Sequence, residues 1–164
     1  MTADRLFNRA EVLKNRAEYN NALLLFNKAL KAYKNDNDRE GILNCLMSIG
    51  DTCRMTGNFK LAEGSYSRAI KLSEKMKDKV TTADAAAGLG LSLRALGRWK
   101  EAINLFSKAK RFYMRNKDEH GMAFVFWAEG GAYRVKGDIS GAIKSFKKSL
   151  KLFSAMKYKP GAGY

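Results

Sequence analysis

Apolar and small residues recur along this chain in a fixed order, with a period of 40 residues. In four places an alanine is followed four residues later by an aromatic residue, and three residues after that by alanine or serine. The three positions are Ala22, Ala62, Ala102 and Ala142; Phe26, Tyr66, Phe106 and Phe146; and Ala29, Ala69, Ala109 and Ser149. Spacings of four and three place side chains on one face of a helix. A period of this length predicts similar units stacked on one another.

Glycines keep the same register upstream of these alanines, at Gly50, Gly90 and Gly130 and at Gly57, Gly97 and Gly137. The second set is typical of residues that end a helix in a left-handed conformation. The first set falls inside a predicted helix, where glycine costs about 1 kcal/mol relative to alanine. A cost that recurs in register indicates close helix packing, and we expect these glycines to face Ala62, Ala102 and Ala142. Each unit is therefore predicted to be an antiparallel pair of helices.

The pattern predicts an all-α chain, and a single proline among 164 residues agrees with that expectation. Helices are expected at 4–16, 18–34, 38–56, 58–76, 79–96, 98–116, 119–136 and 139–157. They group into repeats at about 3–37, 38–77, 78–117 and 118–157, within a single array over residues 1–164. Residues 158–164 are in register with the start of a fifth repeat, so the array is expected to continue beyond Tyr164.

This arrangement resembles the tetratricopeptide repeat (TPR). The resemblance rests on the alanine and aromatic positions above and on Ile49-Gly50 with Cys53, Leu89-Gly90 with Leu93, and Gly130 with Tyr133. The usual period of that family is shorter, and the 40-residue version is similar to the repeats of LGN/Pins-type adaptors. The resemblance implies an α-solenoid of about four helix pairs in a right-handed superhelix. It also implies a concave groove, lined by the first helix of each pair, that binds a peptide.

The family pattern places a defined set of residues in this groove: Lys14, Asn44, Met47, Asp51, Arg54, Asp84, Leu91, Arg94, Phe124, Trp127 and Arg134. Four of them form a cation ladder with the 40-residue period, namely Lys14, Arg54, Arg94 and Arg134. Because arginine pairs well with carboxylates, the ladder predicts an acidic peptide as the ligand. Arginine ladders bind acidic peptides in the LGN-like class, so the resemblance favours the same function. The alternative is that these cations pair with Asp51 or other nearby carboxylates and hold neighbouring helices in place.

The formal net charge of +15 opens another possibility. Residues 98–117 and 138–157 are rich in lysine and arginine, and such a surface attracts nucleic acid or anionic membrane. A third possibility is an end-to-end assembling module, because Ile143, Phe146, Leu150 and Phe153 are expected to leave an uncovered apolar face on the last helix. Solvation alone also explains most of the lysines.

The sequence offers little for catalysis. His120 is the only histidine and falls at a predicted helix start, so we expect no histidine-based triad and no multi-histidine metal site. We expect neither an enzyme nor a cofactor. Cys45 and Cys53 lie eight residues apart on one predicted helix, about 12 Å apart and too far for a disulfide. The first residues lack the apolar core of a signal peptide, so a cytoplasmic protein is expected. The predicted function is a protein-interaction scaffold.

Overall fold

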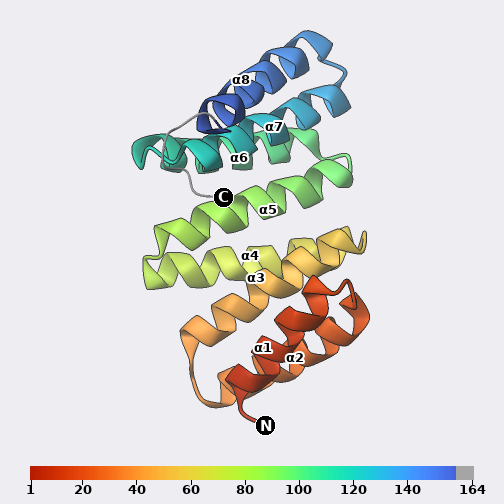
Figure 1. Cartoon of the computed structure of the whole chain (residues 1–164), viewed down its shortest axis with the longest axis vertical. Coiled ribbons are helices and arrows are strands. Elements are labelled where there is room, and N and C mark those ends of the chain that lie inside the picture. Colours follow the sequence, from red (N-terminus) through yellow and green to blue (C-terminus); the bar gives the residue numbers. More distant parts are fainter. Residues whose placement is uncertain (158–164) are drawn as a thin grey trace. The chain divides into compact units, whose positions relative to one another are not determined.

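A computed structural model describes residues 1–157 of the chain, and over these residues it is all-α (Figure 1). The helices are α1 (Ala3–Asn15), α2 (Tyr19–Asn35), α3 (Arg39–Met55), α4 (Phe59–Met76), α5 (Lys79–Ala95), α6 (Trp99–Arg115), α7 (Glu119–Lys136) and α8 (Ile139–Lys157). All eight begin and end within two residues of the predicted bounds, and the fold class is confirmed. The expected start of a fifth repeat, 158–164, lies outside the described residues.

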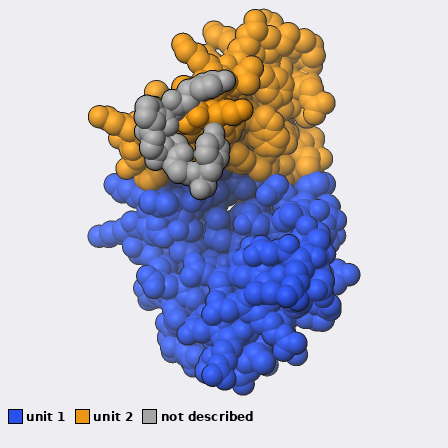
Figure 2. Space-filling model, in the orientation of Figure 1, with its two compact units in different colours: residues 1–88 blue, residues 89–164 orange. Residues whose placement is uncertain are grey.

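The chain divides into two compact units, Met1–Gly88 and Leu89–Tyr164, which Figure 2 colours separately. Within the first unit α1 packs on α2, α2 on α3, and α3 on α4. Within the second unit α6 packs on α7 and α7 on α8. Consecutive helices are joined by short turns, so each unit is built from antiparallel neighbours (Figure 1).

Aspartates begin the first helix of three repeats. The Asp38, Asp78 and Asp118 carboxylates accept hydrogen bonds from the amides three residues ahead, at 2.9, 3.0 and 2.8 Å. An aspartate at this position satisfies an amide that has no partner within the helix. The carboxyl of Asp78 also accepts from the Thr81 hydroxyl, and these hydrogen bonds hold its pKa below the ordinary value. The helix starts expected from the sequence at 38, 79 and 119 lie within one residue of those in the structure.

Left-handed residues end the helices at a period of 40. Gly57, Gly97 and Gly137 have φ of +79°, +79° and +89°, as their position in the pattern predicted. The first repeat carries Ala17 at this position with φ of +60°, although a side chain disfavours that conformation. The unfavourable conformation of Ala17 is compensated by the turn around it, in which the Glu18 amide donates to the Leu13 carbonyl at 2.9 Å.

The helical glycines make room for aromatic rings. A Cβ built on Gly50 would lie 2.8 Å from the Tyr66 ring, and one built on Gly90 would lie 2.5 Å from the Phe106 ring. Gly130 faces Phe146 in the same way, at 2.6 Å. The prediction that these glycines face alanines was therefore wrong. The nearest side chain is the aromatic residue one helical turn beyond the alanine, because a planar ring needs the space that a missing Cβ leaves.

The last helix exposes part of its apolar face. Ile143, Leu150 and Phe153 are 49%, 66% and 40% exposed. Phe146 differs from them because its ring lies against Gly130 of α7. Three of the four residues predicted to be uncovered are exposed, and Phe146 instead joins α7 to α8.

Candidate functional site

One face of α7 combines exposed aromatic surface with positive charge. Phe124, Trp127, Gly131 and Arg134 follow one another at spacings of three, four and three residues, which places them on one face of the helix. Trp127 is 44% exposed, and its ring centroid lies 5.8 Å from that of the half-buried Phe124. Arg134 is exposed at the far end of this face.

Arg94 of α5 packs against the middle of the same face. Its guanidinium carbon lies 5.1 Å from the centroid of the Trp127 ring. Its Nη1 donates a hydrogen bond to the Ala128 carbonyl at 3.2 Å. Gly131 provides the space, since a Cβ built there would lie 2.2 Å from that nitrogen. We call this arrangement of Phe124, Trp127, Arg94 and Arg134 around Gly131 the α7 face.

The α7 face combines an exposed indole ring with guanidinium groups. An indole ring offers a large apolar area at low cost in conformational entropy, and tryptophan and arginine are enriched among the residues that dominate binding energies. A guanidinium stacked on an aromatic ring is oriented before a ligand arrives. In general, a guanidinium pairs with carboxylates and an indole ring covers apolar groups.

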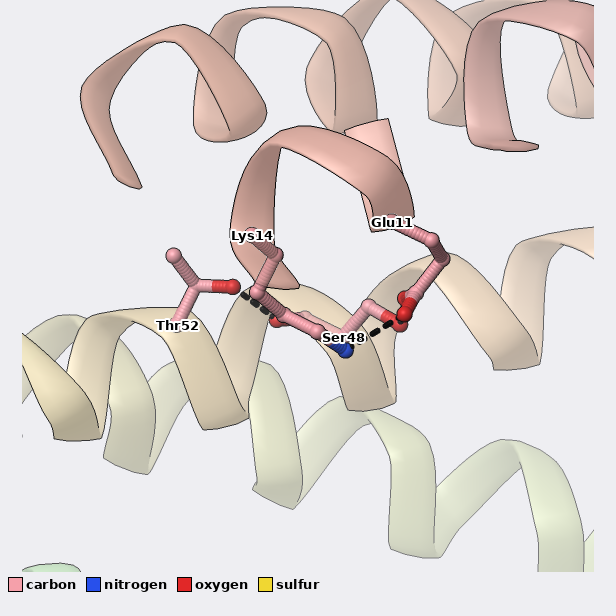
Figure 3. A network of polar contacts seen from close by, with 4 residues as sticks. All are labelled: Glu11, Lys14, Ser48 and Thr52. Atoms are coloured by element: carbon pink, nitrogen blue, oxygen red, sulfur yellow. Dashed lines mark hydrogen bonds and ion pairs between the residues drawn. The ribbon is translucent and has the colours of Figure 1, made fainter. Parts of the chain in front are cut away.

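The first cation of the ladder is engaged within the first unit (Figure 3). The Lys14 ammonium forms an ion pair with Glu11 at 2.6 Å and lies 5.9 Å from the centroid of the Phe26 ring. Glu11 in turn accepts a hydrogen bond from the Ser48 hydroxyl, so the pair connects α1 to α3. Lys14 therefore pairs with a carboxylate of its own chain and helps to hold neighbouring helices together, which was the alternative to ligand binding.

Arg54 and Asp51 lie beside Tyr66. The Tyr66 hydroxyl donates to the Asp51 carboxylate. Burial raises the pKa of Tyr66, the negative charge of Asp51 raises it further, and Arg54 opposes both effects. The Nε of Arg54 is buried and finds no hydrogen-bond partner within residues 1–157. Asp51 thus helps to hold the buried Tyr66 ring in the core of the first unit.

The other predicted groove residues differ in exposure. Asn44 and Asp84 are exposed and Met47 is half-buried. Leu91 is only 5% exposed, so its side chain offers almost no surface to a ligand. Lys14, Asn44, Met47, Asp51, Arg54 and Asp84 belong to the first unit, and Leu91, Arg94, Phe124, Trp127 and Arg134 to the second. The structure brings Trp127 into contact with both Arg94 and Phe124.

An ion pair between α6 and α7 was not predicted from the sequence. The Lys110 ammonium of α6 meets the Glu129 carboxylate of α7 at 2.6 Å, and Glu129 is only 3% exposed. Lys110 and Lys148 also flank the Phe126 ring, at 5.2 and 5.3 Å from its centroid. The available signal was an acidic residue inside the small-residue stretch Ala128-Glu129-Gly130. Its partner, 19 positions earlier on another helix, could not be read from that pattern.

The described part of the chain contains no cluster of metal-ligating side chains, and both of its cysteines are buried. Within residues 1–157 no group of three or more histidine, cysteine, aspartate or glutamate side chains could hold a metal ion. Cys45 and Cys53 are free and buried, and burial raises the pKa of both thiols, that of Cys45 to about 12. Across the same residues, no helix combines the length and apolarity needed to cross a bilayer.

Two family models with the description "Tetratricopeptide repeat" match the chain, over residues 2–75 and 82–113. Together the two ranges cover more than half of the sequence and extend from α1 to α6. The chain belongs to the tetratricopeptide-repeat family. A comparison with curated protein sequences gives no match.

Solved structures share the TPR fold. BtubC (BKLC) from P. vanneervenii has a TM-score of 0.84 at 16% identity, over 99% of this chain and 67% of that one. Aspartyl phosphate phosphatase F from Bacillus subtilis gives 0.83 at 14%, over 95% of this chain and 41% of that one. The TPR domain of Arabidopsis FLU gives 0.67 at 24%, over 71% of this chain and 98% of that domain. At these identities the likeness concerns the fold.

Membership of the TPR family supports a protein–protein interaction scaffold. TPR units stack helices whose surfaces bind protein partners, and members of the family are generally not enzymes.

Proposed function

We propose that this TPR protein binds an acidic segment of a partner protein, and that the α7 face is the principal contact. The observation that carries the proposal is the Arg94 guanidinium held between the exposed Trp127 ring and Gly131. Trp127 and Phe124 would cover an apolar side chain of the segment, and Arg134 would pair with its carboxylates. The net charge of +15 favours an acidic partner over a basic one.

The remaining groove residues stay part of the proposal. Arg54, Asn44 and Met47 all lie on α3 and would extend the acidic-peptide surface into the first unit. The resemblance to LGN/Pins-type adaptors suggests such an extended surface. A peptide that contacts both α3 and α7 would have to be longer than the stretch that α7 alone can contact. Lys14 is left out as a ligand-binding residue because Glu11 already neutralises it. We further propose that the protein acts in the cytoplasm.

An array of peptides with varied composition tests the ligand chemistry. The protein should select peptides that combine aspartate or glutamate with a leucine or an aromatic residue. Arg134→Glu and Trp127→Ala both alter exposed positions, and each should weaken selected peptides about tenfold or more. Arg111→Glu changes the charge equally at an exposed site on α6 and is the matched control. Selection without acidic enrichment, or equal losses in the control, would contradict the proposal.

A basic docking surface is the second candidate. Lys100 and Lys136 flank the Trp99 ring, each 5.4 Å from its centroid, so lysine and aromatic side chains do gather in the second unit. This candidate predicts steeply salt-dependent binding to nucleic acid or anionic vesicles. Charge reversal at Lys147, Lys148 and Lys151 would abolish that binding, while Arg134→Glu and Trp127→Ala would spare it.

Self-association is a further candidate, favoured by the exposed Leu150 and Phe153 of α8. It predicts oligomers that increase with concentration in sedimentation experiments. Leu150→Glu would abolish them if this face is the contact, and a monomer at all concentrations would exclude the candidate.

A further inference from the structure

Gly64 is unlike the other glycines of the described chain. Each of the others either faces a side chain that leaves no room for a Cβ or adopts a left-handed conformation. Gly64 does neither: it lies inside α4 with helical geometry, and nothing approaches within 4 Å of a Cβ built on it. Glycine in a helix interior is disfavoured relative to alanine. Packing within the described residues therefore gives no reason for glycine at this position.

Gly64 lies on the wall of a surface cleft of about 340 Å³. The cleft belongs to the first unit and is bounded by α2, α3 and α4. Its size falls in the range of roughly 300–1,000 Å³ that is usual for ligand pockets. A Cβ at Gly64 would meet no neighbouring side chain within 4 Å, so a side chain at this position has space on the cleft wall.

The lining of the cleft combines aliphatic side chains with two basic ones. Leu23 and Leu30 of α2, Ile49 of α3 and Leu61 of α4 supply aliphatic surface, and Leu61 is 63% exposed. Both charged residues of the lining, Lys60 and Arg68, are cationic and exposed.

The positions of these two cations define the charge of the occupant. Lys60 and Arg68 stand four residues before and four residues after Gly64, so they lie on the same side of α4 as the glycine. The described lining contains no carboxylate that could neutralise them. A ligand that fills the cleft with an apolar group beside Gly64 therefore meets positive charge one helical turn before and one turn after the glycine.

We propose that this cleft is a second docking site, which takes one apolar side chain of a partner segment flanked by carboxylates. The aliphatic side chains hold the apolar group, Lys60 and Arg68 pair with the flanking acids, and Gly64 lets the partner backbone approach α4 closely. The site involves none of the residues of the α7 face, so it stands independently of the function proposed above.

The test uses two capped peptides and the full chain. The sequences are Asp-Glu-Leu-Asp-Glu and Lys-Lys-Leu-Lys-Lys, and binding is followed by amide and methyl chemical shifts in NMR titrations. The acidic peptide should shift the signals of Leu23, Ile49, Leu61 and Gly64 in a saturable manner. The basic peptide should leave them unchanged. Short peptides bind weakly, so the expected result is the location and the saturation of the shifts.

Variants of the cleft separate a specific site from general charge attraction. Gly64→Leu should fill the cleft and abolish the saturable shifts, whereas Asn104→Leu, at the equivalent exposed position of α6, should leave them intact. Arg68→Glu should weaken the acidic peptide at least fivefold. Unchanged affinity in Gly64→Leu, or equal shifts with the basic peptide, would overturn the proposal. Shifts confined to the α7 face would also overturn it while supporting the proposed function.

Discussion

The ion pair between Lys110 and Glu129 allows a quantitative test of the packing between α6 and α7. The Glu129 side chain is 4% exposed and the Lys110 side chain 25%, with 2.6 Å between the charged atoms. Lys110→Met keeps the aliphatic stem but leaves a buried carboxylate without its partner. Removing one member of a buried pair costs about 3–5 kcal/mol. That is a large part of the roughly 5–15 kcal/mol that stabilises a typical domain.

Removing the acid of the pair should cost less stability than removing the base. Glu129→Gln leaves Lys110 without its acid, but a side chain that is 25% exposed can turn its ammonium towards water. We expect a loss of about 1–2 kcal/mol, close to that of one hydrogen bond to a charged group. Replacing both residues, with Lys110→Met and Glu129→Leu, removes the desolvated charges together. The double variant should then be as stable as the native chain or more stable, by about 1–4 kcal/mol.

Urea unfolding followed by circular dichroism measures these differences, and the single variant Glu129→Leu completes the double-mutant cycle. We expect Lys110→Met to have the lowest free energy of unfolding of the set, and the double variant to regain at least the native value. If Lys110→Met lost less than about 1 kcal/mol and the changes were additive, the pair would not act as a buried ion pair.

Three further predictions follow from single positions. Ala17→Gly should raise the free energy of unfolding by about 1 kcal/mol in the same urea assay, because Ala17 has φ of +60°, and an unchanged midpoint would contradict this. Gly131→Ala should displace the end of the Arg94 side chain and weaken the binding of selected acidic peptides. The free energy of unfolding should change by less than about 1 kcal/mol, because the gain in helix propensity offsets the lost hydrogen bond. The pKa of Cys45 is raised from 9.0 to about 12 by burial and by the charges of Asp38 and Glu11, so the unfolded chain releases this proton first. Stability should therefore hold below pH 9 and fall as the pH rises towards 12, and Cys45→Val should make that fall shallower in urea titrations.

The sequence was informative wherever one position repeats. The alanine and aromatic positions and the glycines that end helices each recur every 40 residues, and they predicted the helices to within two residues. The contact of Gly50 was mispredicted because periodicity shows that space is needed without showing which side chain fills it. The Tyr66 ring fills it in the structure.

The candidate site was predictable only in part. The period revealed the cation ladder, but Lys14 pairs with Glu11 and Arg94 packs on Trp127, so equivalent positions have different contacts. Such differences depend on single non-repeating residues, such as Gly131. The cleft beside Gly64 left no repeated signal at all, because leucine, asparagine and lysine occupy the equivalent positions of the other repeats.

The most direct test of the α7 face uses the fluorescence of Trp127 during peptide binding. The chain contains two tryptophans, so Trp99→Phe leaves Trp127 as the only indole reporter. Because Trp127 is 44% exposed, an acidic peptide selected on the array should shift its emission to the blue in a saturable manner as it covers the ring. The same peptide with lysine in place of every acidic residue should produce no shift. If an acidic peptide bound saturably and left the Trp127 emission unchanged, the α7 face would not be its principal contact.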